Sequence, residues 1–259
     1  MATRDEPSSV QSVDKALSII EVLLRDARTK PARDIADQTG VNRTTAHRLL
    51  NALIQRGWAE RVPGSSEYGL GWRFMALMRI ALDQRDLFAE VRPILETLSD
   101  TSRETVHLGV MDGMDILHVD KVDSPEAIGV SSKIGSRAVP HLTGLGKAIL
   151  AASDRDSLDQ YIRYALTLTG AEAMTDPDRF REELRQIAAA GYSVDDEEAS
   201  PGVRCLGMAI RGADGAPLFA ISVTGPAGRF TRDRLQAFAP TMLDVGRQLS
   251  GRFGWEEPE

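Results

Sequence analysis

Apolar positions recur at helical spacing in three segments near the start of the chain. A first helix is predicted to start near Ser12, and its apolar stripe comprises Val13, Ala16, Leu17, Ile20, Leu23 and Leu24. A second helix is predicted over 32–39 and a third over 42–55. Gly40 separates them, because glycine readily adopts the left-handed conformation that ends a helix. The apolar face of the third helix comprises Ala46, Leu49, Leu50, Leu53 and Ile54.

The opposite face of the third helix is polar and carries Thr44, Arg48, Asn51 and Gln55, with His47 beside them. Gly57 ends this helix. Two short extended segments follow, 58–62 and 67–70, joined by a Pro-Gly-Ser-Ser turn. Two short helices separated by a glycine and followed by a small hairpin are typical of a winged helix-turn-helix. The pattern therefore predicts that this part of the chain binds DNA.

Helical and extended patterns alternate in the remainder of the chain. An apolar helix over 72–82 is predicted to link two domains, and another helix follows over 87–101. Further helices are predicted over 144–152, 154–164, 177–190 and 231–253, and strands over 105–110, 116–122, 128–132, 192–195, 203–210 and 218–223. Strands with helices around them predict an α+β fold with a mostly antiparallel sheet flanked by helices. We therefore expect a DNA-binding domain over 12–71, a linker helix over 72–83 and a second domain over 84–253.

The balance of charge changes sign between these parts. The 259-residue chain has a formal net charge of −7, which by itself argues against binding nucleic acid. Residues 1–80, however, hold 12 basic and 9 acidic residues, whereas the remainder holds 19 basic and 29 acidic residues. A local basic excess favours contact with phosphates even in a protein that is acidic overall.

Composition argues against several other classes of protein. No run approaches the roughly 18 apolar residues of a membrane span, and the polar first ten residues are unlike a signal peptide. The single cysteine, Cys205, excludes an intrachain disulfide and suits a reducing cytoplasm, where we expect the protein to act. His118 and Asp120 share one strand face, but a metal ion needs more ligands than this pair. We therefore expect no metal, no cofactor and no membrane partner.

Seven blocks of sequence carry a resemblance to a known family. They are S-V-D-K-A-L-S-I-I-E, D-I-A-D-Q-T-G-V-N-R-T-T-A-H-R-L-L-N-A-L, E-Y-G-L-G, I-L-H-V-D-K-V-D-S-P, H-L-T-G-L-G-K-A-I-L-A, D-D-E-E-A-S-P-G-V-R-C-L and A-I-S-V-T-G-P-A-G-R-F-T. In this order they resemble the IclR-type transcriptional regulators, over residues 12–252. The resemblance implies a winged helix, a linker helix and a GAF-like effector-binding domain. It also implies a homodimer or homotetramer that binds double-stranded operator DNA.

The third helix supplies the candidate base contacts. The major groove admits a helix and presents a distinct code of donors and acceptors, which Arg48 can read at guanine and Asn51 at adenine. Arg43 is placed to reach a phosphate, and the wing tip is placed to touch the backbone or the minor groove. The candidate DNA contacts are Arg43, Thr44, Thr45, His47, Arg48, Asn51, Ser65 and Ser66. A merely solvated helix face and a plain surface turn are the alternatives.

The start of the helix over 144–152 is the candidate effector site. Its unpaired N–H groups and partial positive charge suit the carboxylate of a small organic acid. It is not a phosphate-binding P-loop, because His141 replaces the first glycine of that motif and Ala148 follows the lysine. The resemblance implies effector contacts from Gly144, Leu145, Asp195, Cys205, Ser222 and Thr224. The alternative is that the glycines only permit tight packing and that the other residues belong to the core.

Two other functions compete with an effector-responsive regulator. An enzyme could use Cys205 as its nucleophile and His141 or His118 as its base, but no catalytic motif surrounds the cysteine. The second domain could instead serve chiefly for oligomerisation or protein interaction, without a metabolite. We expect a transcriptional regulator that binds a palindromic operator as an oligomer. The sequence does not distinguish repression from activation.

Overall fold

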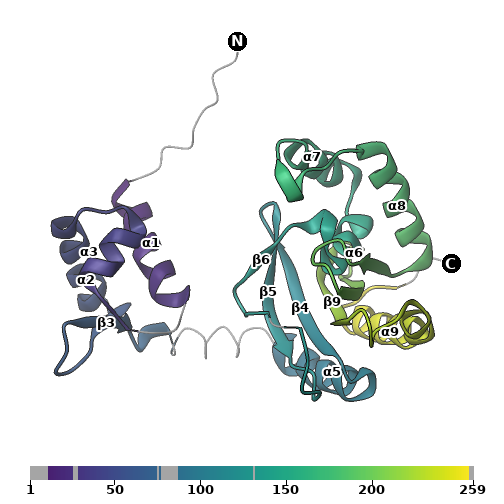
Figure 1. Cartoon of the computed structure of the whole chain (residues 1–259), viewed down its shortest axis with the longest axis horizontal. Coiled ribbons are helices and arrows are strands. Elements are labelled where there is room, and N and C mark those ends of the chain that lie inside the picture. Colours follow the sequence, from purple (N-terminus) through teal and green to yellow (C-terminus); the bar gives the residue numbers. More distant parts are fainter. Residues whose placement is uncertain (1–10, 26–28, 75, 77–86, 131, 257–259) are drawn as a thin grey trace, which may run out of the picture. The chain divides into compact units, whose positions relative to one another are not determined.

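Separate apolar cores divide the chain into two units, Met1–Phe88 and Ala89–Glu259 (Figure 1). The computed structural model describes residues 11–25, 29–74, 76, 87–130 and 132–256. Of the predicted linker helix over 72–83, only 72–74 and 76 are described, so most of that prediction lies outside the described residues.

The first unit combines three helices with a small antiparallel sheet. Its elements are α1 (Gln11–Arg25), β1 (Lys30–Pro31), α2 (Ala32–Thr39), α3 (Arg43–Gln55), β2 (Ala59–Arg61) and β3 (Glu67–Leu70). The sheet order is β1-β3-β2. The hairpin was predicted, but β1 was not, because a two-residue strand has no periodicity to recognise. Its pairing of Lys30 with Tyr68 ties the connection after α1 to the wing.

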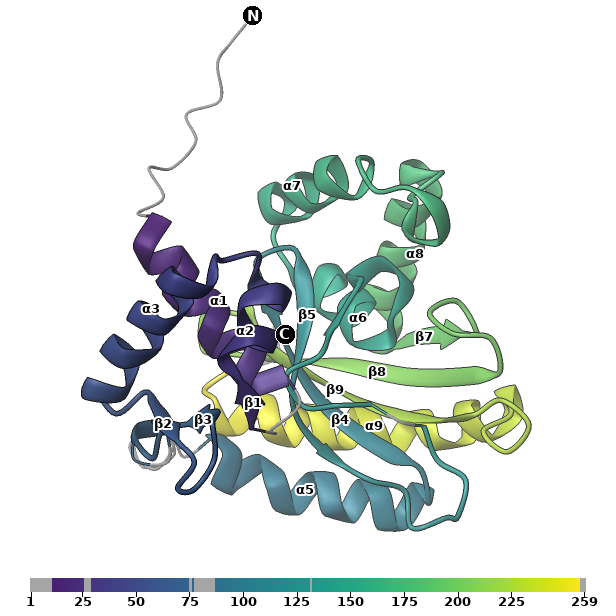
Figure 2. The same cartoon turned by 60° about the vertical axis from the view of Figure 1, so that its left-hand side comes forward.

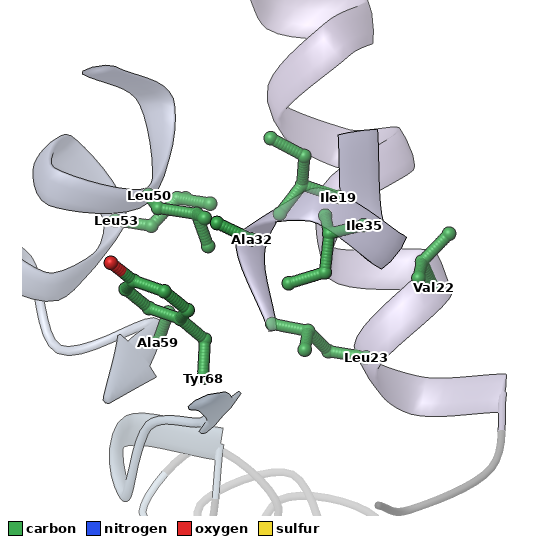
Figure 3. Packing of buried hydrophobic residues seen from close by; sticks show 9 residues of the cluster. All are labelled: Ile19, Val22, Leu23, Ala32, Ile35, Leu50, Leu53, Ala59 and Tyr68. Carbon is green, nitrogen blue, oxygen red and sulfur yellow. The ribbon is translucent and has the colours of Figure 1, made fainter. Parts of the chain in front are cut away.

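Figure 3 shows the core of the first unit, in which side chains from all three helices meet β2 and β3. The members drawn are Ile19, Val22, Leu23, Ala32, Ile35, Leu50, Leu53, Ala59 and Tyr68. The stripe predicted for α1 was partly wrong, because Val13, Leu17 and Leu24 are about half exposed, at 52%, 51% and 49%. Apolar residues surround most of α1, so periodicity alone did not select the face that contains Ile19.

The turn between α2 and α3 fixes the direction of the third helix. Gly40 has a φ of 66°, in the left-handed region that glycine tolerates best. The Asn42 side chain accepts a hydrogen bond from the Thr45 N–H at 2.9 Å and so caps α3. Ala36, Val41 and Ala46 form a small buried cluster behind the turn. The turn thus holds the two helices together by side-chain packing as well as by its backbone.

The second unit is built on one six-stranded sheet (Figure 2). Its elements are α5 (Leu87–Ser102), β4 (Thr105–Asp112), β5 (Asp115–Val122), β6 (Arg137–Ala138), η1 (Pro140–Leu142), α6 (Gly144–Ala152), α7 (Arg155–Ala165), η2 (Gly170–Glu172), α8 (Pro177–Ala190), β7 (Ser193–Asp196), β8 (Val203–Arg211), β9 (Pro217–Pro226) and α9 (Arg232–Arg252). The strand order is β6-β5-β4-β9-β8-β7, and every neighbouring pair is antiparallel. This confirms the predicted α+β fold.

The strand predicted over 128–132 is wrong, since none of its described residues is extended in a sheet. Ile128 is 72% exposed, and its carbonyl accepts a hydrogen bond from the Arg229 guanidinium at 2.9 Å instead of a strand partner. The edge strand lies further along, where Arg137 and Ala138 pair with β5. The apolar residues of the predicted strand therefore belong to a connecting loop.

Helices cover both faces of the sheet. α6 packs on β8 and β9, with α8 against it, and α9 packs on the other face of β8. Figure 2 shows α5 beside α9 on that face. α9 is the longest helix described, with 21 residues, and it carries charged residues in its first turn and in its C-terminal half. No helix within the described ranges is long and apolar enough to cross a bilayer.

Gly146 in the first turn of α6 offers a test of this packing. A Cβ there would lie 2.2 Å from the Cα of Pro140, and a backbone atom cannot easily move away. We expect Gly146→Ala to lower the free energy of unfolding of the C-terminal domain by about 3 kcal/mol in calorimetric melting. The control is Gly251→Ala in α9, where an added Cβ meets no atom within 4 Å. It should be neutral or stabilise the domain by up to about 1 kcal/mol, and equal losses would contradict this account.

Candidate DNA interface and effector site

The polar face of α3 is solvent-exposed. Ala46, Leu50 and Leu53 are buried in the first unit, whereas the other side of the helix presents Arg43, Thr44, His47, Arg48 and Asn51 to solvent. The helix face that periodicity predicted to be polar and exposed is therefore exposed in the structure. Thr45 is half-buried, and its backbone N–H is already bonded to Asn42. Thr45 is thus the least accessible of the candidate residues on this helix.

An aromatic contact joins α3 to the wing. The ring of His47 meets the ring of Tyr68 in β3 edge to face, with the centroids 6.4 Å apart. At the wing tip, Ser66 is exposed, whereas Ser65 is half-buried and its hydroxyl accepts the Glu67 N–H at 3.1 Å. Ser66 is therefore the freer of the two predicted wing contacts.

The first turn of α6 lies directly on β8. A Cβ added at Gly144 would lie 3.2 Å from the Cβ of Cys205 and 3.3 Å from the nitrogen of Gly207. The Ser193 hydroxyl donates to the Gly144 carbonyl at 2.5 Å and so attaches β7 to the same turn. Thr143 caps α6 through the N–H of Gly146, and this cap does not use the N–H groups of Gly144 and Leu145.

Polar side chains gather on the sheet face beneath this turn. Asp195 pairs in register with Cys205, Cys205 with Thr224, and Ser222 with His107, across four neighbouring strands. Since alternate residues of a strand share a face, they lie on the same face as Ser193 and Gly207, which contact α6. We call Asp195, Cys205, Ser222, Thr224 and His107 the polar cluster. All five are buried, with at most 8% of each exposed.

Four members of the polar cluster contact one another through Thr224. The Thr224 hydroxyl lies 2.6 Å from the Cys205 sulfur, 3.4 Å from the Ser222 hydroxyl and 3.3 Å from His107 Nδ1. On its other side, His107 Nε2 lies 2.7 Å from the Ser132 hydroxyl. The structure therefore brings together the effector residues implied by the resemblance and adds His107. The signal missed in the sequence was a histidine at an inward position of an otherwise apolar strand.

Burial sets the charges of this cluster. It raises the pKa of Asp195 from its ordinary 3.8 to about 6, although the N–H groups of Glu198 and Ala199 bond to the carboxylate and oppose the shift. Burial also raises the pKa of the Cys205 thiol to about 12 and lowers the pKa of His107 to about 3. At neutral pH the thiol and the imidazole are therefore uncharged, and Asp195 carries the negative charge of the cluster.

This geometry disfavours the nucleophilic alternative. The Cys205 sulfur is bonded to Thr224, whereas His141 is bonded to the Tyr161 hydroxyl and His118 faces Ser136. A thiol with a raised pKa is a poor nucleophile, and neither of the two histidines considered as its base is bonded to it. In the part of the chain that the structure describes, no group of three or more His, Cys, Asp or Glu residues is placed to hold a metal ion.

Asp195 should make the stability of the C-terminal domain depend on pH. Between about pH 4 and 6, the folded protein keeps a proton that the unfolded chain has lost, so stability falls as pH rises through this window. Asp195→Asn keeps an acceptor oxygen and should remove this fall. Its stability relative to wild type should increase by up to about 3 kcal/mol from pH 4 to pH 7 in calorimetry. Parallel pH profiles of the two proteins would show that Asp195 titrates normally.

Comparisons with known proteins agree with both halves of this description. Residues 12–63 match the IclR helix-turn-helix domain, and residues 79–251 match the C-terminal domain of the bacterial transcriptional regulator IclR. The transcriptional repressor IclR of Escherichia coli K12 is 30% identical over 257 residues, which cover 98% of this chain and 94% of that protein.

Solved structures share the fold over nearly the whole chain. An IclR-type transcriptional regulator from Silicibacter sp. TM1040 has a TM-score of 0.77 and 26% identity, covering 95% of this chain and 98% of its own. An IclR homologue from Microbacterium hydrocarbonoxydans, complexed with 4-hydroxybenzoate, has a TM-score of 0.76 and 21% identity, covering 94% and 97%. The two family matches include the exposed face of α3 and the polar cluster. The relatives named in this family are transcriptional regulators and not enzymes. The matches show that this chain belongs to the IclR family of DNA-binding transcriptional regulators.

Proposed function

We propose that this regulator reads operator half-sites with the exposed face of α3, as a homodimer or homotetramer acting in the cytoplasm. The observation that carries this proposal is the separation of faces on α3, with Ala46, Leu50 and Leu53 buried and Arg48 and Asn51 exposed. A helix oriented in this way can enter the major groove without disturbing its own core. Arg43 and the wing residue Ser66 would contact the backbone, which fixes register but does not specify sequence.

Arg48→Ala tests the reading face. Losing a bidentate contact to guanine should weaken binding to a DNA site selected from random duplexes by about 10- to 100-fold, with little effect on non-specific duplex. The control is Arg33→Ala, which removes an exposed arginine of α2 that is paired with Asp37. It should change both affinities by less than about threefold in fluorescence anisotropy at fixed salt. Equal losses of DNA affinity in the two variants would mean that Arg48 contributes only its positive charge and does not read a base.

We further propose that a small organic acid binds between α6 and the polar cluster. Its carboxylate would accept the N–H groups of Gly144 and Leu145, and its other end would face Asp195, Cys205, Ser222 and Thr224. The supporting observation is a polar cluster buried against a helix start. The 4-hydroxybenzoate complex of the Microbacterium homologue supports an acid of this size in this fold. The acid would change DNA binding only through its different affinities for the two arrangements of the protein.

One observation favours a second candidate, a C-terminal domain that serves only for oligomerisation or protein interaction. The polar cluster is closed on itself, because Thr224 contacts Cys205, Ser222 and His107. Polar groups that already hydrogen-bond to one another need no ligand as a hydrogen-bond partner. Screening for ligands distinguishes the two candidates.

Thermal-shift screening with 4-hydroxybenzoate and a panel of short carboxylic acids tests the effector proposal. A ligand of the folded state raises the melting temperature, and at 100 times its Kd it adds about 2.7 kcal/mol. Ser222→Ala should weaken binding of any acid found by about tenfold. Ser250→Ala, which alters a buried serine of α9 bonded to the Arg211 N–H, should leave the affinity unchanged. If no acid stabilises the wild type, the second candidate is favoured.

A further inference from the structure

Lys147 is a fully buried cation one turn after the start of α6. None of its side chain is exposed. Its ammonium donates to Glu183 at 2.6 Å, to both carboxylate oxygens of Glu198 at 2.6 Å and to the Val194 carbonyl at 3.2 Å. A charge removed from water is stable only with such partners. Three separate elements, α8, β7 and the segment after β7, therefore converge on one atom of α6.

Glu198 is also bonded to Asp195 of the polar cluster, which lies at the end of β7. The Asp195 carboxylate accepts the N–H of Glu198 at 2.8 Å and the N–H of Ala199 at 3.3 Å, so the two acids are coupled through the backbone. Glu197 between them has a φ of 69°, which a non-glycine residue rarely adopts. Its carboxylate also accepts the Gly202 N–H at 3.0 Å. Side-chain contacts thus hold residues 196–202, which we call the acidic loop, in a tight turn.

The two carboxylates on Lys147 differ in what they are attached to. Glu183 lies within the regular helix α8, whereas Glu198 lies in the acidic loop. Both are partly exposed, at 38% and 39%, so water can replace either contact on the carboxylate side. If Glu198 leaves, Lys147 keeps Glu183 and the Val194 carbonyl. The start of the loop stays attached, because the Arg204 guanidinium donates to Glu197 at 2.9 Å. Release of the part after Glu197 therefore leaves no buried charge without a partner, which is the usual obstacle to breaking a buried ion pair.

We infer that Lys147 is the positioning residue of the effector site, and that its bond to Glu198 is a releasable catch that closes the acidic loop over the polar cluster. This inference rests on the proposed effector site and adds how that site is closed. With the catch made, Asp195 is held beside the start of α6 and the cluster is buried. With the catch broken, the part of the acidic loop after Glu197 moves away, and Cys205 and Thr224 become accessible to small molecules.

Cys205 provides a built-in reporter of this opening. It is the only cysteine of the chain and is 8% exposed, so any thiol modification reports access to the cluster. In the closed form burial raises its pKa to about 12, and almost no reactive thiolate is present. The experiment measures the rate at which N-ethylmaleimide modifies the full-length protein at pH 8 without any ligand.

Glu198→Ala and Glu183→Ala form a matched pair, since each removes one carboxylate at 2.6 Å from the same ammonium. We expect Glu198→Ala to accelerate modification of Cys205 at least tenfold, and Glu183→Ala to leave the rate within twofold of wild type. Lys147→Met, which removes the catch altogether, should match Glu198→Ala. Equal rates in the two glutamate variants, or no acceleration in Glu198→Ala, overturn the inference. We expect both variants to melt at a lower temperature than the wild type. A loss of stability common to both cannot explain a difference between their rates of Cys205 modification.

The experiment distinguishes failure of this inference from failure of the effector proposal. Selective acceleration in Glu198→Ala, in a protein that no acid stabilises, would support the catch and count against the effector. If an acid protects Cys205 in the wild type but the two glutamate variants react at equal rates, the effector proposal is supported and the catch is contradicted.

Discussion

The C-terminal domain depends on the close approach of the first turn of α6 to β8. Gly207 permits this approach, because a Cβ there would lie 2.3 Å from the Gly144 carbonyl oxygen. The contact places the start of a helix, with its partial positive charge, directly over a strand that carries Cys205. A larger residue at either glycine would separate the two backbones. The helix start and the polar cluster would then no longer share one buried space.

Buried charges organise the surroundings of this contact. Lys147 connects α6 to α8 and to the acidic loop, and Arg204, 8% exposed, connects β8 to Asp196 at the start of that loop. Glu104, fully buried, is paired with Arg229 and Arg234 where β4 and β9 meet the start of α9. Because breaking a buried pair leaves a charge uncompensated, each of these pairs fixes a connection that apolar packing alone would leave adjustable. Both carboxylates of Arg204, Asp196 and Glu197, lie at the start of the acidic loop. Lys147 differs because its second carboxylate, Glu183, lies in α8 and stays when the loop moves, which is why we assign the movable contact to it.

The two units meet different structural requirements. The first must expose a polar helix face while burying the opposite face, and the cluster of Ala36, Val41 and Ala46 holds α3 in that orientation. The second must bury polar groups without leaving them unsatisfied, and it does so by pairing Thr224 with Cys205 and His107 with Ser132. This chain thus contains an exposed polar helix face, which we propose for DNA, and a closed polar interior.

The sequence by itself determined most helices and strands, the exposed face of α3 and the α+β class, because these follow from periodicity and from local signals such as Gly40. It also pointed to Gly144, Asp195, Cys205 and Thr224 through the family motifs. Only the tertiary structure decided which face of α1 is buried, that Arg137 and Ala138 form the edge strand, and that His107 joins the polar cluster. It alone brought Glu183 and Glu198 to Lys147, 36 and 51 residues away. Such contacts depend on strand order and on packing between distant segments, and no local pattern in the chain encodes them.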